Sequence, residues 1–313
     1  MSAKWNVADI PPQHGRRIVV TGASSGLGLE TSVALAAKGA EVIMACRDPA
    51  RASAALAKVQ ARAPGAKAEL MTLDLADLAS VRRFAADCAR RFDHIDVLCN
   101  NAGVMALPLQ RTKDGFEMQM GTNHLGHFAL TGLLLDLLKA APAGARIVSV
   151  ASNAHRWGLR LDPDDLNFER RRYNKWDAYG RSKLANLMFH FELDRRLRAA
   201  QIDLRSVCAH PGYAATNLMF VGPAQENSRI GTLMMRIGNA LLSQDQAMGA
   251  LPQLYAITMP DVEGGDYFGP DGWQQLKGHP RRVGCLRLAR DPERGRRLWA
   301  ASERLTGVRY LSA

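Results

Sequence analysis

The segment RIVVTGASSGLG at residues 17–28 decides the fold. A short run rich in β-branched residues leads directly into three glycines, Gly22, Gly26 and Gly28, and a helix-forming stretch follows them. Such a strand–turn–helix unit brings backbone N–H groups to a helix N-terminus, where a pyrophosphate can approach closely. The spacing G-x-x-x-G-x-G therefore predicts a nucleotide site, although a plain strand–helix turn would also use these glycines.

The same alternation of short strands and helices continues along the chain. Apolar runs predict strands at 17–21, 41–46, 68–73, 95–100, 145–150 and 204–209. Amphipathic stretches predict helices at about 26–38, 50–62, 77–91, 115–138, 178–199 and 245–257. Asp77 has the position of a helix N-cap, and Ser243 with Gln246 has the spacing of a capping box. Repeated βα units predict an α/β fold, a Rossmann-type doubly wound parallel sheet with helices on both faces.

We expect a single domain over residues 1–313, since no low-complexity linker divides the chain. Its cofactor half would span about 15–150 and its catalytic and substrate half about 151–313. The chain carries 41 basic and 30 acidic residues, a net charge of +11, and the last 37 residues hold ten basic and three acidic ones. No nucleic-acid-binding module accompanies this charge, so we expect no nucleic-acid partner.

The cysteines and the N-terminal sequence bear on the compartment. There are five cysteines and no C-x-x-C pair, so we expect neither a disulfide framework nor a metal site. The first residues are too polar for a secretory signal, and no apolar run is long enough to span a bilayer. Together these features predict a cytoplasmic protein.

The residue after the second predicted strand indicates which cofactor is bound. NAD-binding domains usually carry an acidic residue there for the ribose 2′-hydroxyl, whereas an arginine suits a 2′-phosphate. In this chain Arg47 comes first, and Asp48 beside Pro49 has the position of a helix cap. Because a guanidinium can hold a phosphate bidentately, we expect NADP(H) rather than NAD. An ordinary solvated arginine is the alternative.

Candidate catalytic groups lie at the carboxyl ends of later strands or in the helices that follow them. Tyr179 and Lys183 are four residues apart, so they share one helical face, where an ammonium would favour the phenolate and lower the pKa of the phenol. Ser152 follows the fifth strand, Asn123 lies in the helix after the sequence NNAG (100–103), and the sixth strand ends at HPG (210–212). Ligands of open α/β sheets bind at this edge.

In this order and spacing, the motifs resemble the short-chain dehydrogenase/reductase superfamily over essentially the full length of the chain. The segments GTNHLGHF (121–128) and AYGRSKLANL (178–187) resemble its retinol dehydrogenase-like branch. TGASSGLGLE and VIMACRD are also similar to light-dependent protochlorophyllide reductase. The resemblance implies hydride transfer between a nicotinamide and a carbonyl or alcohol carbon.

The resemblance also implies roles for individual residues. Tyr179 would be the general acid/base, Lys183 would bind the nicotinamide ribose, Ser152 would polarise the substrate oxygen, and Asn123 would hold a water chain. The chain has Ala151 before Ser152 where the family usually has a second serine. The residues that would contact the cofactor are Gly22, Ser24, Ser25, Gly26, Leu27, Gly28, Arg47, Asp74, Leu75, Asn101, Ala102, Gly103, Tyr179, Lys183, Pro211, Gly212 and Thr216.

The segment at about 213–242 follows the Pro-Gly turn, where this family places a helical substrate lid. Its many Met and Leu residues favour a lipophilic small-molecule substrate of retinal, steroid or aldehyde type, although they would equally suit a helix pair packed on the body. Two other functions are weighed against carbonyl reduction. One is reduction of a C=C bond, as in protochlorophyllide reductase, and the other is non-catalytic sensing of NADP.

Two surface features suggest partners. The helix expected at Pro292–Leu305 carries Arg294, Arg296 and Arg297 beside Leu298 and Trp299, a pattern that could lie on an anionic membrane. An exposed terminal helix is the alternative. Members of the resembled family often pair through helix faces, so a homo-oligomer is also expected.

Overall fold

The computed structural model describes residues 4–213 and 244–311. Its centre is one eight-stranded sheet in the order β3-β2-β1-β4-β5-β6-β7-β8. The strands are β1 (Arg17–Thr21), β2 (Glu41–Cys46), β3 (Ala68–Thr72), β4 (Val97–Asn100), β5 (Ala145–Val150), β6 (Leu204–Ala209), β7 (Tyr267–Pro270) and β8 (Pro280–Arg282). The strands β1 to β7 pair in parallel and β8 pairs antiparallel to β7, so the expected doubly wound sheet is confirmed.

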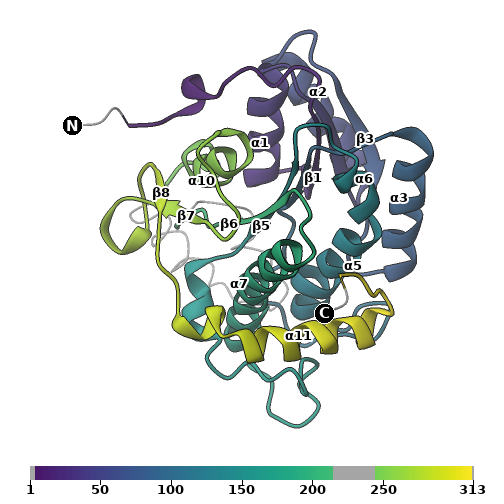
Figure 1. Ribbon diagram of the computed structural model, residues 1–313, viewed down its shortest axis with the longest axis vertical. Helices are drawn as coiled ribbons and strands as arrows, with labels where there is room; N and C mark the ends of the chain where they lie inside the picture. The colour runs from purple at the N-terminus through teal and green to yellow at the C-terminus, as the bar shows by residue number, and fades with distance from the viewer. Residues whose placement is uncertain (1–3, 214–243, 312–313) are drawn as a thin grey trace.

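Helices cover both faces of the sheet (Figure 1). On one face lie α1 (Gly26–Ala37), α2 (Pro49–Arg62) and α10 (Gln246–Thr258), which share a core with Ile18 and Val20. On the other lie α3 (Leu78–Arg91), α5 (Gly126–Leu133), α6 (Leu135–Lys139) and α7 (Lys175–Ala199), around Val19 and Leu98. Successive strand residues alternate between the two cores, as the period of a strand requires.

The C-terminal helix α11 (Pro292–Thr306) packs outside this second layer. Trp299 is 2% exposed, and its ring stacks on Phe189 of α7 and lies edge-on to Phe128 of α5. Leu298 is buried as well. The apolar face of this helix therefore belongs to the core, and only its basic side remains for a membrane.

Most boundaries predicted from the sequence are confirmed, but two strands were not predicted and two expectations are wrong. The apolar patterns did not reveal β7 and β8. The expected helix at 115–138 is interrupted, with α4 (Met118–Met120), a π-helical turn η2 (Gly121–Leu125), α5 and α6 following one another. The N-cap of α10 is Asp245, which accepts from the Ala247 N–H, and Ser243 lies outside the described residues. Asp48 and Asp77 cap α2 and α3 as expected.

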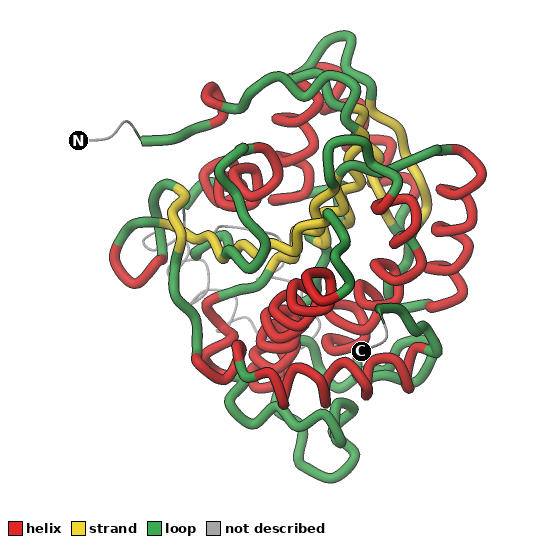
Figure 2. The backbone as a smooth tube through the Cα atoms, viewed as in Figure 1, coloured by secondary structure: helices red, strands yellow, loops and turns green. Residues whose placement is uncertain are grey.

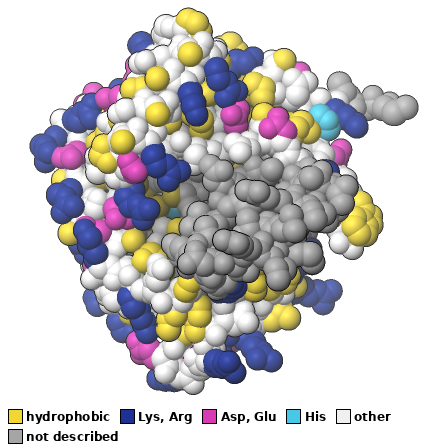
Figure 3. Space-filling model, turned by 180° about the vertical axis from the view of Figure 1, so that it is seen from behind, with side chains coloured by type: hydrophobic (Ala, Val, Ile, Leu, Met, Phe, Trp, Pro, Cys, Tyr) yellow, Lys and Arg dark blue, Asp and Glu magenta, His cyan; other side chains and the backbone are white. Residues whose placement is uncertain are grey.

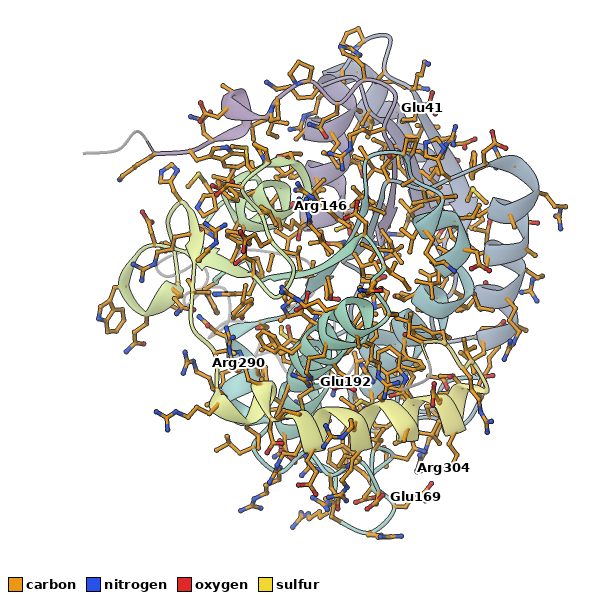
Figure 4. All side chains as sticks on the ribbon, in the orientation of Figure 1. Glu41, Arg146, Glu169, Glu192, Arg290 and Arg304 are labelled. Carbon is orange, nitrogen blue, oxygen red and sulfur yellow. The ribbon has the colours of Figure 1, made fainter. Side chains whose placement is uncertain are left out.

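The loops at the carboxyl ends of the parallel strands hold the short helix η3 (Asn153–Trp157) after β5 and η4 (Trp273–Gln275) after β7. Figure 2 shows the long loop between η3 and α7 extending away from the sheet. Glu169, labelled in Figure 4, lies in this loop at the bottom of the view.

Candidate active site

The glycine loop after β1 has a conformation that requires its glycines. Gly22 and Gly26 have φ of +68° and +58°, the left-handed region that side chains rarely adopt. A Cβ added at Gly28 would lie 2.5 Å from the Gly22 carbonyl oxygen and 2.6 Å from Asn101 Nδ2. Ser25 is the N-cap of α1 but makes no side-chain hydrogen bond to its first turn. The start of α1 therefore has the open backbone geometry that a pyrophosphate needs.

A buried threonine ties this loop to the NNAG segment. Thr21 Oγ1 accepts from the backbone N–H groups of Asn101 and Ala102, at 2.9 Å each, and it lies 2.9 Å from His127 Nε2. Asn101 Nδ2 donates in turn to the Thr21 carbonyl at 2.7 Å. The amide of Asn101 thus holds two strand ends together, and its expected place near the adenosine ribose stays a prediction.

The end of β2 presents two arginines rather than one. Arg47 follows the strand and is exposed, as expected for a residue that receives a phosphate. Asp48 is committed to the α2 cap, accepting from the N–H groups of Ala50 and Arg51. Arg51 Nη2 lies 3.5 Å from Ser25 Oγ of the glycine loop. Arg51 was not among the site residues expected from the sequence, although its place in the first turn of the helix after β2 was a usable signal.

Asp74 and Leu75 follow β3 on the same edge. The Asp74 carboxylate accepts from the Ala76 N–H at 3.0 Å, and the backbone N–H of Asp74 donates to Ser80 Oγ at 3.0 Å. Leu75 is buried, and a Cβ on Gly126 would lie 2.5 Å from its carbonyl oxygen. The start of α5 therefore packs directly on this loop. This contact holds Asp74 at the same edge of the sheet as the glycine loop.

The four expected catalytic residues come together between β5 and α7. Ser152 lies two residues after the end of β5, and Tyr179 and Lys183 lie on the first turns of α7. Ser152 and Tyr179 share a side-chain hydrogen bond. The Lys183 ammonium lies 5.9 Å from the centroid of the Tyr179 ring and donates to the Val150 carbonyl at 3.0 Å.

Asn123 reaches the same group of residues from the π-helical turn. Its Oδ1 accepts from the Val104 N–H at 2.7 Å, and its Nδ2 donates to the Val104 carbonyl and to Ser182 Oγ, at 2.9 Å each. A Cβ added at Gly103 would lie 3.2 Å from Asn123 Oδ1 and 3.5 Å from Lys183 Nζ. The interrupted helix thus brings the amide of Asn123 against the NNAG loop and close to Lys183.

Two glycines allow η3 to approach α7. A Cβ on Gly180 would lie 2.8 Å from the Gly158 nitrogen, and a Cβ on Gly158 would lie 2.5 Å from the Gly180 carbonyl carbon. Any larger side chain at either position would push the two segments apart. Gly180, the residue after Tyr179, therefore sets the distance across which Ser152 and the phenol meet.

Burial controls the protonation of the central pair. Burial raises the pKa of Tyr179 to about 12, against a smaller lowering by the hydrogen bond with Ser152. Burial also lowers the pKa of the Lys183 ammonium to about 8. In the chain alone burial dominates the pKa of Tyr179, so the lowering by Lys183 and a bound nicotinamide stays a prediction for the cofactor complex. At neutral pH Tyr179 is therefore a neutral phenol with a proton to donate.

His155 was not expected at the site from the sequence, yet it contacts Ser152 directly. His155 is fully buried, and its Nδ1 lies 2.7 Å from the Ser152 carbonyl oxygen, which also accepts from the His155 N–H at 3.0 Å. Burial lowers the pKa of His155 to about 4. A carbonyl only accepts, so the neutral ring carries its proton on Nδ1 and donates it to Ser152.

The HPG turn after β6 closes the site. Gly212 has φ of +66°, and a Cβ there would lie 2.3 Å from the Leu276 carbonyl oxygen. Pro211 is held through its carbonyl, which accepts from Gln244 Nε2 at 2.7 Å. Thr216, and the expected lid at about 213–242 apart from Tyr213, lie outside the described residues.

Within residues 4–213 and 244–311, no group of three or more His, Cys, Asp or Glu side chains is arranged to hold a metal ion. The arginines at 170–172 belong to a structured loop, in which Arg171 pairs with Asp162 and Asp165 at 3.0 and 2.8 Å. None of the helices in the described part of the chain combines the length and the apolarity needed to cross a membrane.

Comparisons with known proteins agree with this geometry. The model of the short chain dehydrogenase family matches residues 16–162. Human retinol dehydrogenase 13 is 40% identical over 301 residues, covering 94% of this chain and 85% of that protein. The crystal structure of an uncharacterised protein from Mycobacterium paratuberculosis is 44% identical, with a TM-score of 0.79 and 98% of each chain covered. A short-chain dehydrogenase from Shigella flexneri, solved as a complex with NADP, shares the fold at 21% identity, a TM-score of 0.62 and coverage of 82% of this chain and 96% of that one.

The fold and the site define an oxidoreductase that acts on alcohols or carbonyls and uses a nicotinamide cofactor. The chain belongs to the short-chain dehydrogenase family, in its retinol dehydrogenase-like branch.

Proposed function

We propose that this protein is an NADP-dependent reductase of lipophilic carbonyl compounds, with Tyr179 as the proton donor. The observation that carries the proposal is the meeting of Ser152, Tyr179, Lys183 and Asn123 at the carboxyl end of β5. The chain keeps both Tyr179 and Lys183, which argues against a sensor without turnover. Its relatives include a retinol dehydrogenase, which supports a retinal-like or otherwise lipophilic substrate.

NADP preference is supported by the β2–α2 junction. Arg47 and Arg51 are exposed there and Asp48 is occupied by the helix cap, so two cations and no free carboxylate would meet the adenosine ribose. A 2′-phosphate would bind to such a pair, whereas a ribose 2′-hydroxyl would have no acidic acceptor.

The chemistry of each side chain follows from its surroundings. A nicotinamide bound beside Tyr179 and Lys183 would supply the hydride for the carbonyl carbon. The Ser152 hydroxyl donates a hydrogen bond to the carbonyl oxygen and so stabilises the negative charge that develops on it. Tyr179, neutral because burial raises its pKa to about 12, transfers its proton to that oxygen and completes the alcohol.

Lys183 and Asn123 restore that proton. Lys183 stabilises the tyrosinate through its charge, and its pKa of about 8 lets it exchange protons near neutral pH. Asn123 holds the NNAG loop against Lys183, which positions the lysine beside the cofactor ribose and the water chain expected there.

The decisive experiment replaces Tyr179 by Phe and measures NADPH oxidation with a panel of retinal, steroid ketones and aliphatic aldehydes. Removing only the hydroxyl eliminates the proton donor, so we expect turnover to fall at least about a hundredfold. NADPH affinity, measured by fluorescence titration, should stay within about twofold, since the ring remains in place. If the wild type reduces none of these carbonyls, or if the variant keeps a substantial rate, the proposal is wrong.

A further inference from the structure

The loop after β5 exposes large apolar side chains beside the active site. In the described part of the chain, the exposed large hydrophobic residues are Leu109, Trp157, Leu159 and Trp273, with exposed fractions of 50%, 57%, 57% and 76%. All four lie in loops or short 3-10 helices and none lies on α11. Trp157 and Leu159 are two residues apart in the segment RWGLR (156–160). A tryptophan and a leucine exposed this closely need an explanation beyond chance.

These side chains are connected to the catalytic tyrosine. The ring of Trp157 lies edge-on to that of Trp176, with 6.1 Å between centroids. Trp176 packs in turn on the apolar cluster that contains Met105, Ala106 and Tyr179. Apolar surface therefore continues from the exposed Trp157 indole to the wall of the active site.

The turn that carries Trp273 is fastened to the same place. Asn153 Nδ2, in η3, donates to the carbonyl oxygens of Gln274 and Gln275 at 3.1 and 3.3 Å. We define the entrance rim as Arg156, Trp157, Leu159, Arg160 and Trp273. The rim thus joins the loop that follows β5 and the loop that follows β7.

The charge of the entrance rim is positive. Arg156 and Arg160 are exposed, and neither forms an ion pair with any residue in the described ranges. The nearby acidic side chains are already neutralised, because Asp162 and Asp165 pair with Arg171, and Asp164 pairs with Arg297 at 2.8 Å. Figure 3 shows a face of the molecule where Lys and Arg side chains alternate with hydrophobic ones.

The sequence suggested that α11 could lie on a membrane, but the burial of its largest apolar side chains argues against this helix. Leu298 and Trp299 are buried, so α11 has no free apolar side chain of this size to insert. The entrance rim has both parts that an interfacial surface requires, aromatic and aliphatic side chains to insert and cations to meet the headgroups.

We propose that the entrance rim docks on an anionic lipid surface and turns the mouth of the active site toward it. Trp157 and Leu159 would insert at the headgroup level, while Arg156 and Arg160 bind lipid phosphates. A lipophilic carbonyl in the lipid would then be held close to the wall of the active site that Trp176 and Tyr179 form. Docking needs no turnover, whereas this delivery of substrate rests on the proposed function.

The test is flotation of the full-length protein with vesicles of phosphatidylcholine, with and without about a quarter phosphatidylglycerol. We expect the wild type to float with the anionic vesicles at low salt and to be released at high salt. The double variant Trp157→Ser/Leu159→Ser should lose at least about tenfold in partitioning, because it has nothing to insert.

A matched pair of charge variants separates the rim from general basicity. Two double variants remove the same charge: Arg156→Gln/Arg160→Gln and Arg296→Gln/Arg304→Gln. The second pair lies exposed on α11, and Figure 4 labels Arg304 near the C-terminal end of this helix. We expect only the first pair to weaken flotation strongly. NADPH binding confirms folding of every variant.

Three results would overturn docking at the rim. One is a wild type that does not float at low salt, and another is equal loss from both arginine pairs. The third is a concentration-dependent dimer, seen by sedimentation without lipid, that Trp157→Ser/Leu159→Ser abolishes, since the rim would then bind a second copy. Failure of carbonyl reduction would leave flotation unaffected, so the two proposals fail separately.

Discussion

At the scale of single residues, burial rather than sequence proximity decides the chemistry. Tyr179 and Lys183 are one helical turn apart, yet burial shifts both toward their neutral forms. A spacing rule cannot show this, because it contains no information about desolvation. In the proposed reduction, this neutral phenol would be the group that donates the proton.

His155 gives a sharper example of a residue that acts through another. Its Nδ1–H bond fixes the Ser152 carbonyl, and the Ser152 side chain caps η3 by accepting from the Ala154 N–H at 3.1 Å. Both bonds set the direction in which the Ser152 hydroxyl points. In the proposed mechanism, His155 would therefore be a positioning residue for Ser152, the group that would polarise the substrate.

Three substitutions test this role. His155→Leu should lower kcat about tenfold or more while KM and NADPH affinity change little, since orientation is lost but the pocket remains. His155→Asn keeps an N–H donor at the place of Nδ1 and should recover most of kcat. His155→Gln places its donor near Nε2 instead and should behave like His155→Leu. Equal losses in Asn and Gln variants, measured below their unfolding temperatures, would show a merely structural role.

At the scale of elements, the β2–α2 junction combines a strand end, a helix cap and two cations. Capping by Asp48 begins α2 early enough that Arg51 lies in its first turn, facing Ser25. Arg51 thereby lies beside the glycine loop, and Arg47 is exposed at the end of β2 just before the helix. In the proposed NADP site, the 2′-phosphate would therefore meet two arginines of this junction and not Arg47 alone.

We expect Arg47→Ala and Arg51→Ala each to weaken NADPH binding about tenfold, the effect of losing one charged hydrogen bond to phosphate. NADH affinity should not change, because NADH lacks the 2′-phosphate. Lys58→Ala, an exposed cation later on the same helix, is the control and should leave both affinities unchanged. Parallel losses for NADPH and NADH in fluorescence titrations would contradict a 2′-phosphate site.

The strands that could be predicted from the sequence are those covered on both faces of the sheet. β1, β2, β5 and β6 were predicted to the residue because runs such as EVIMAC and ARIVSV are mainly apolar and contain adjacent β-branched residues. β7 reads YFGP and β8 reads PRR, and neither has a β-branched residue. These two segments form strands because they pair at the edge of the sheet, and the local sequence contains no signal for that pairing.

The site was predictable to a similar degree. Motif residues converge because parallel strands bring their carboxyl ends to one edge, so Ser152, Tyr179 and Asn123 could be placed together. The contacts of His155 and the Gly158–Gly180 approach depend on how η3 folds back onto α7. That packing arises only in three dimensions.

The helix α11 also changes how self-association is pictured. It packs on α5 and α7 through Trp299, whose ring lies 4.4 Å from the Arg196 guanidinium, and Glu192 anchors Arg195 and Arg196 beneath it (Figure 4). A homo-oligomer stays a prediction, but this face of α5 and α7 is already covered by the chain's own helix.

At the scale of the whole molecule, the stability of the fold depends on pH through histidines that burial keeps uncharged. Burial lowers the pKa of His124, His190 and His210 to about 3, and that of His127 and His155 to about 4. All five are therefore neutral in the folded chain well below the pH at which free histidine is protonated. In mild acid the unfolded chain binds protons on these five histidines, and it must release them in order to fold.

The sign of the resulting pH dependence is fixed. Stability is fully present above the unfolded pKa of about 6.5 and is lost as pH falls toward the folded values. At pH 5.5 each histidine costs about 1 kcal/mol, so together they remove several kcal/mol, a large part of the stability of an ordinary domain. Glu117 and Asp194 act oppositely, since burial raises their pKa, but only two such carboxyls are buried this way in the described residues.

We therefore expect the unfolding temperature to drop steeply between about pH 7 and pH 5.5, well above the range where ordinary carboxylates titrate. Denaturant titrations at closely spaced pH values give the number of protons taken up on unfolding from the slope of the unfolding free energy. Near pH 5.5 that number should be roughly four, because each unfolded histidine is then mostly protonated. An uptake near one would mean that most of these rings are already charged, or exposed, in the folded protein.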